Sequence, residues 1–240
     1  MGRRIDNSVP SIAMVRPMSY SRPFFALLDG KPNGARHVQT VHDLGVLRVP
    51  SGRLEACDPI IMLGEGVVVD VPPGAYPVRL THVVDAADGL SGAAYVSVVV
   101  REDLPVSQVR TVTSHEDQEE QEELAWVVTD STGIGFVDHE AVDRCMPPEG
   151  EREELILDGD PPHTPSWLDL LDAPDHVRED SADIRLPLAT HEENVILARS
   201  WMGQGDHVVV TTHAADGVLL AVHIDAFAHD LDLEHAADRP

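Results

Sequence analysis

Three histidines and three aspartates lie close together near the end of the chain, in the stretch GQGDHVVVTTHAADGVLLAVHID at residues 203–225. Imidazole and carboxylate groups are the side chains that most often bind zinc or exchange protons in catalysis. The valines and leucines between them indicate two strands joined by a turn. These polar side chains can form one site only if they occupy the same face of those strands.

The hairpin pattern separates the three histidines. A two-residue turn at Asp216-Gly217 would set His213 opposite Leu220, whereas a longer turn that starts at Ala214 would shift this register but not the alternation within each strand. Alternate residues of a strand share a face, so His207 and His213 point to one side of the hairpin and His223 points to the other. Three zinc ligands must converge on a single point. We therefore expect no metal and no cofactor here, and partly exposed histidines that belong to the scaffold.

Other loops offer a second set of candidate catalytic residues. Asp130 opens an Asp-Ser-Thr-Gly motif similar to that of aspartic proteases, which need two such aspartates, and the chain has no second motif. The segment SWMGQGDH at residues 200–207 lacks the lysine and the spacing of a phosphate-binding loop. A hydrolase or metal-assisted enzyme would have to gather its site residues from loops at one end of a sheet: Asp130, Asp138, Asp206 and His207.

The composition favours a different class of function. The 240 residues include 17 Lys and Arg against 42 Asp and Glu, a formal net charge of −25. This charge repels phosphate groups, so we expect no direct binding to nucleic acid or to an anionic membrane surface, and it suits a basic protein partner. No segment resembles a signal peptide or a membrane helix, so we expect a cytoplasmic protein. Cys57 and Cys145 lack metal or redox spacing, and we expect reduced, partly buried thiols.

Short apolar strands separated by Pro and Gly turns fill residues 43–228, which we expect to form one β-rich domain. The pattern predicts an α+β fold, mostly antiparallel β, as a sandwich or strongly twisted sheet with one or two short helices. Asp138 is placed to cap a helix over residues 138–145, and Thr164 to cap one that begins at Pro165. Residues 1–42 should form a partly ordered extension whose Phe24-Phe25 pair docks on the body, and residues 229–240 a flexible acidic tail.

Five sequence motifs occur in the same order as in a known family: LGVLRVPSGRLEACDP, VPPGAYPV, DSTGIGFVD, NVILARSWMGQGDH and HAADGVLLAVHIDAF. With them the chain resembles the bacterial domain of unknown function 4241 family over about residues 43–228. The resemblance implies a single β-rich domain in a bacterial, cytosolic setting, and it implies no activity. The chain departs from the family pattern in the loop from Gly203 to His207, so this loop is a better place to look for function than the hairpin after it.

Taken together, these features favour an interaction module over an enzyme. One concrete form is an immunity or inhibitor protein that blocks a basic toxin or a basic nucleic-acid-binding protein. The alternatives are the enzyme with the Asp/His loop site and a structural subunit of a larger assembly. The sequence leaves the identity of the partner and the oligomeric state open.

Overall fold

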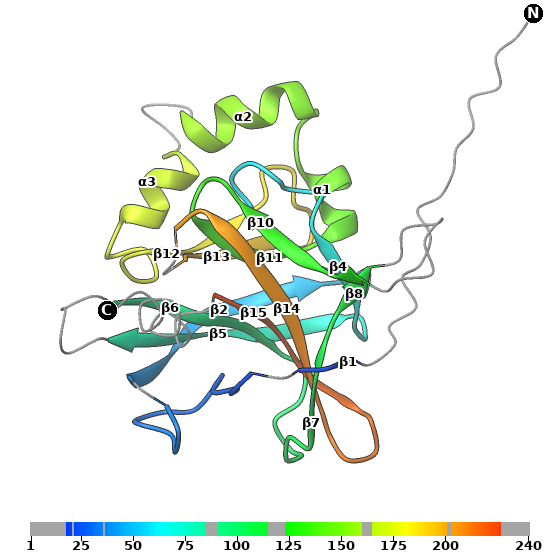
Figure 1. Ribbon diagram of the computed structural model, residues 1–240. Coiled ribbons are helices and arrows are strands. Elements are labelled where there is room, and N and C mark those ends of the chain that lie inside the picture. The colour runs from blue at the N-terminus through cyan, green and yellow to red at the C-terminus, as the bar shows by residue number, and fades with distance from the viewer. Residues whose placement is uncertain are drawn as a thin grey trace, which may run out of the picture.

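Two antiparallel β-sheets pack face to face, and three short helices lie on the outer side of one of them (Figure 1). This arrangement comes from a computed structural model. It describes residues 18–226 with gaps at residues 21, 36, 85–90, 115–122, 160–164 and 201–202. The predicted acidic tail and the first residues of the extension lie outside the described part of the chain. The predicted α+β class, mostly antiparallel β, is confirmed.

The larger sheet, sheet A, has eight strands. Seven of them follow the order β1 (Met18–Ser19), β7 (Gln108–Thr111), β14 (Gly205–His213), β15 (Leu219–Asp225), β6 (Ser91–Val99), β5 (Gly74–Val84) and β2 (Val38–Val49). The eighth, β10 (Trp126–Thr129), pairs with the first half of β14, while β7 pairs with its second half.

Sheet B has five strands in the order β12 (Ser181–Arg185), β13 (Asn194–Arg199), β11 (Gly133–Asp138), β3 (Arg53–Cys57) and β4 (Val67–Asp70). Two further short strands, β8 (Thr113–Ser114) and β9 (Glu123–Leu124), pair with each other. Every described pairing between these strands is antiparallel, as expected for strands joined by tight Pro and Gly turns.

Sheet B is buried on both faces, which explains its continuous apolar runs. Along β13, Ile196 faces sheet A in the main core, whereas Leu197 faces the helices. Along β11, Phe136 and Val137 divide in the same way. Aliphatic side chains fill most of the core between the two sheets, consistent with the low aromatic content of the chain.

Three helices cover the outer face of sheet B: α1 (His139–Cys145), α2 (Glu149–Leu157) and α3 (Trp167–Asp172). Val142, Ile156 and Leu171 join the second apolar cluster beneath them. The first helix is capped by Asp138, as predicted. The third begins two residues later than predicted, because Ser166 forms a capping box with Asp169; the predicted cap, Thr164, lies outside the described residues. Nothing in the sequence pattern predicted α2, where Ile156 is the one buried side chain among residues 150–157.

The N-terminal segment covers the outer face of sheet A. Phe25 is buried there, and the Phe24 ring packs edge-on against Tyr95 and His223. The Gln39 side-chain amide donates a hydrogen bond to the Phe25 carbonyl oxygen at 2.7 Å. The prediction that the Phe24-Phe25 pair docks on the body is confirmed. No helix in the described part of the chain is long and apolar enough to cross a membrane.

The β14–β15 hairpin differs from its predicted register at the turn. Gly217 N–H donates to the Ala214 carbonyl oxygen, and Gly217 adopts a left-handed φ of 86°. The loop is therefore the longer turn that starts at Ala214, and not the two-residue turn at Asp216-Gly217. A bulge beside His213 sets it opposite Leu219, so the predicted contact with Leu220 is wrong. The bulge leaves the rest of the hairpin unchanged, and Val210 pairs with His223.

Candidate functional site

The Asp-Ser-Thr-Gly turn and the loop before β14 meet where β10 pairs with β14. Val128 lies opposite Asp206 in this pairing. The Gln204 side-chain amide donates a hydrogen bond to the Asp130 carbonyl oxygen over 2.6 Å. The structure thus brings three of the four predicted site residues to one region: Asp130 and Asp206 are exposed there, and His207 is buried.

Behind this loop His207 belongs to a cluster of buried hydroxyl groups. Its Nε2 lies 3.1 Å from Ser200 Oγ and 3.4 Å from Thr129 Oγ1. The Thr129 hydroxyl is also within 3.2 Å of the Gly203 carbonyl oxygen. Burial lowers the pKa of His207 to about 4, against the opposing effect of the Asp206 and Asp58 carboxylates. The imidazole is therefore neutral at pH 7.

Asp58, at the end of β3, holds the Asp-Ser-Thr-Gly turn in place. Its buried carboxylate accepts hydrogen bonds from Asp130 N at 3.2 Å, from Ser131 N at 2.9 Å and from Ser131 Oγ at 2.5 Å. It also accepts one from Ile60 N at 3.0 Å, in the turn that follows it. The sequence indicated only that Asp58-Pro59 opens a turn. It did not predict that Asp58 binds the backbone of Asp130, 72 residues further along the chain.

These contacts limit what the region can do chemically. A serine beside a histidine is the start of a nucleophilic site, and the Ser200–His207 distance fits that chemistry. However, Ser200 is 6% exposed and His207 is 1% exposed, so both groups are largely shielded from solvent. The Asp58 carboxylate is occupied by four hydrogen-bond donors. The described geometry is that of a buried polar support for two loops.

Asp138 lies at the opposite end of β11 from the Asp-Ser-Thr-Gly turn. One of its carboxylate oxygens accepts a hydrogen bond from Ala141 N at 2.9 Å, as an N-cap, and the other accepts one from Ser51 N at 2.8 Å. The six residues of β11 span about 16 Å at the usual rise of a strand. Asp138 is therefore not part of a site with Asp130, Asp206 and His207.

A second buried carboxylate, Glu55 on β3, anchors the loop at residues 58–66. It accepts hydrogen bonds from Gly64 N at 2.8 Å and from Gly66 N at 3.1 Å, and His139 Nδ1–H donates to it at 2.7 Å. The hydrogen bond to Glu55 raises the pKa of His139 against the opposing effect of burial. Sequence reasoning missed this group, because nothing in the spacing of Glu55 and His139 links β3 to α1.

The histidines of the hairpin are divided as predicted, but two of them are fully buried. His223 is enclosed on the outer face of sheet A, where its Nδ1 lies 2.8 Å from Ser97 Oγ and its Nε2 lies 3.2 Å from Thr212 Oγ1. Burial lowers its pKa to about 3. The expectation of partly exposed histidines is therefore wrong for His207 and His223, and right for His213, which is half-buried.

No group of three or more His, Cys, Asp or Glu side chains in the described part of the chain is arranged to hold a metal ion. Both cysteines are unpaired and buried. Burial raises the pKa of the Cys57 thiol, and the neighbouring Glu55 raises it further. Cys57 is therefore a protonated core residue and not a nucleophile.

An open groove of about 500 Å³ lies between the loop at residues 58–66 and α2. Apolar side chains from both walls line it, and charged side chains stand among them. The apolar residues are Ile60, Ile61, Leu63, Ile156 and Leu157, and the charged ones are Glu65, Asp143, Arg152 and Glu153. The groove is the candidate binding surface of the helical layer, which we define as residues 139–180.

Comparison with known proteins identifies the family. The family model described as "Protein of unknown function (DUF4241)" matches residues 47–224, about three quarters of the chain. The chain belongs to the DUF4241 family. No curated protein matches this DUF4241 chain. No solved structure matches it either.

The residues of the motifs by which the chain resembles DUF4241 proteins hold turns and loops in place. Gly52 adopts a φ of 78°, and a Cβ atom there would lie 2.7 Å from the Val71 carbonyl oxygen, so only glycine fits the turn. Asp58 is the aspartate of the ACDP phrase and supports the turn at Ser131. The Tyr76 hydroxyl donates a hydrogen bond to the Pro72 carbonyl oxygen within the VPPGAYPV phrase. Trp201 and Met202, in the loop before β14, lie outside the described residues.

Proposed function

We propose that this DUF4241 protein is an interaction module that binds a basic protein partner through its helical layer. The observation that carries the proposal is the uneven distribution of charge. Residues 139–180 contain thirteen Asp and Glu against three Arg, so this stretch alone contributes −10 to the net charge of −25. A surface of one sign raises the rate at which an oppositely charged partner is captured, and it disfavours partners of like charge.

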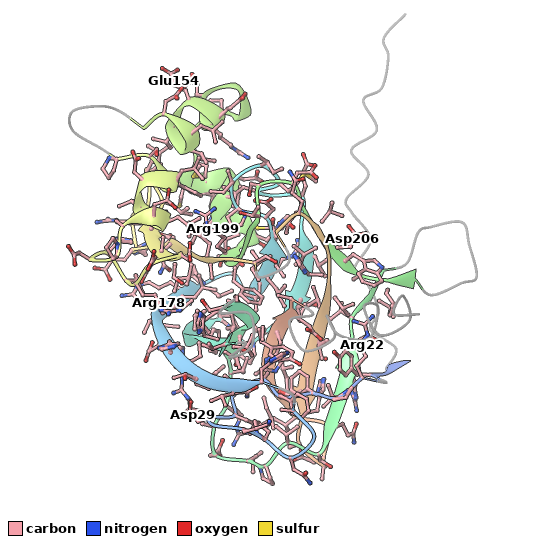
Figure 2. The ribbon with its side chains drawn as sticks, turned by 60° about the vertical axis from the view of Figure 1, so that its left-hand side comes forward. Arg22, Asp29, Glu154, Arg178, Arg199 and Asp206 are labelled. Atoms are coloured by element: carbon pink, nitrogen blue, oxygen red, sulfur yellow. The ribbon has the colours of Figure 1, made fainter. Side chains whose placement is uncertain are left out.

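The carboxylates of α2 are available to such a partner. Glu151, Glu153 and Glu154 are exposed, and none of them forms an ion pair with any residue that the structure describes. Figure 2 shows Glu154 on the outer side of this layer, far from Asp206. By contrast, Asp172 and Asp180 are both paired with Arg199. The free charge of the layer is therefore greatest on α2.

A partner of this kind would use a surface rich in Lys or Arg for its own activity, as a basic toxin or a nucleic-acid-binding protein does. Covering that surface would inactivate the partner, which is the action of an immunity or inhibitor protein. The buried state of Ser200 and His207 supports binding over hydrolysis as the role of the chain.

The test is affinity capture from an extract of the host cell, with wild-type protein and two charge variants as bait. The first variant carries Glu151→Gln, Glu153→Gln and Glu154→Gln. The control carries Asp70→Asn, Glu102→Gln and Glu192→Gln, exposed carboxylates outside the helical layer that change the net charge equally. We expect a basic protein that wild type and control retain at low salt, that the first variant loses, and that high salt releases. Equal capture by both variants would contradict the proposal.

A further inference from the structure

We infer that the groove between the loop at residues 58–66 and α2 seats an apolar side chain from a basic, amphipathic segment of the partner. The inference rests on the proposed function and adds to it the place and the chemistry of recognition. An acidic surface alone would attract any cation, whereas an apolar seat within it selects segments that combine arginine or lysine with an aliphatic side chain.

The groove has the composition that such a segment requires. Ile60, Leu63 and Ile156 are buried or nearly so and form its floor, while Ile61 is 46% exposed and Leu157 is 37% exposed at its edges. Exposed large aliphatic side chains lose water contact when a partner covers them, which favours binding. A volume of about 500 Å³ lies within the range of sites that enclose small ligands.

One wall of the groove is fixed by hydrogen bonds to its backbone. Asp58 accepts from Ile60 N, and its carbonyl oxygen accepts from Met62 N at 2.9 Å. Glu55 accepts from Gly64 N and Gly66 N. A wall held in this way needs little ordering when a partner binds, so less of the binding free energy is lost to conformational entropy.

The charges around the groove identify its occupant as basic. Glu65, Asp143 and Glu153 stand at its edge, against the single cation Arg152. The Arg152 guanidinium already donates a hydrogen bond from Nε to the Pro147 carbonyl oxygen at 2.9 Å. A second copy of this chain would bring another net charge of −25 to the same place, and an anionic membrane would be repelled. A basic peptide segment is the occupant that this combination favours.

The test uses two synthetic peptides with the same number of arginines. One carries leucines along one helical face, and its twin carries serines in their place. Fluorescence anisotropy measures their Kd for wild-type protein, for the double variant Ile61→Ser and Leu157→Ser, and for a control with Val106→Ser and Leu188→Ser. Each of these four residues is exposed, so thermal melts should show that both variants remain folded; the control pair is 57% and 56% exposed and lies outside the groove.

We expect both peptides to bind wild type in a salt-dependent manner, with the leucine peptide about tenfold tighter. The groove variant should lose this tenfold difference and keep its affinity for the serine peptide, while the control should match wild type. Equal affinity for the two peptides would overturn the inference and leave the proposed function standing. Absence of binding by either peptide would overturn both. Self-association of wild type that the groove variant lacks would identify a second copy as the occupant, which also overturns the inference.

Discussion

Acid should destabilise the protein through the two histidines that are fully buried in the described part of the chain, His207 and His223, and His223 gives the sharper test. Its pKa is about 3 in the folded chain, because the ring is enclosed between sheet A and Phe24, and about 6.5 when the chain is unfolded. As the pH falls below 6.5, the unfolded chain binds a proton that the folded chain does not. The free energy of unfolding therefore falls as the pH decreases from 6.5 toward 3.

The size of the effect follows from the two pKa values. At pH 5 a histidine with a pKa of about 6.5 is almost fully protonated in the unfolded chain, while His223 remains neutral in the folded chain. The cost to stability is then about 2 kcal/mol relative to pH 7. His207, with a pKa of about 4, adds a similar cost. The raised pKa of His139 acts in the opposite direction, since its protonated form pairs with Glu55 and stabilises the fold at low pH.

Urea unfolding at pH 7 and pH 5 isolates the contribution of His223 if wild type is compared with His223→Asn. The variant should be less stable than wild type at pH 7, because the hydrogen bonds to Ser97 and Thr212 are altered. Between pH 7 and pH 5, however, it should lose about 2 kcal/mol less than wild type. The exposed His191→Asn serves as control and should follow wild type. An equal loss in wild type and His223→Asn would refute the reasoning, because the effects of His207 and His139 are common to both proteins.

Three further predictions concern the support of the loops, the packing of sheet B and the start of α2. Asp58→Asn should lower the free energy of unfolding by about 2–4 kcal/mol in urea titrations, because one amide oxygen cannot replace a carboxylate that accepts four hydrogen bonds. The exposed Asp130→Asn should change it by less than about 0.5 kcal/mol, and a similar loss in both variants would contradict the role of Asp58. Gly135→Ala should cost about 2–4 kcal/mol, because the new Cβ would lie 2.5 Å from the Ile196 carbonyl oxygen. Gly150→Ala on α2, where no atom beyond the chain neighbours and the helix's own backbone lies within 4 Å of a new Cβ, should instead raise the thermal midpoint through a gain of up to about 1 kcal/mol. A fall in that midpoint would show that the open space is needed.

The strands and the helix cap could be predicted from local sequence patterns, because the residues that form each pattern lie within a few positions of each other. The alternation in residues 207–213 and 219–225 determined which face each histidine occupies, and Asp138 was identified as a cap from its position before α1. The sequence allowed two turns, and the longer one from Ala214, with its shifted register at His213, is the one that forms; local pattern alone did not decide between them.

The candidate site required information that no local pattern holds. Glu55 and His139 are 84 residues apart, and Asp58 and Ser131 are 73 residues apart, so their contacts follow from the pairing of β3 with β11. The four predicted site residues were grouped by residue type, which could not show that Asp138 and Asp130 lie at opposite ends of β11. The groove was missed because its second wall is α2, a helix whose sequence has no clear apolar stripe.

The way in which the loop at residues 58–66 is anchored has a consequence for its evolution. The carboxylates of Asp58 and Glu55 accept hydrogen bonds from the main-chain N–H groups of Ile60, Gly64 and Gly66. The side chain of Ile61 takes no part in these hydrogen bonds. The backbone path is thus set independently of the residue displayed at the edge of the groove. Relatives that keep the two carboxylates can exchange this residue without rebuilding the fold, so single substitutions can change the chemistry at the edge of the groove on one scaffold.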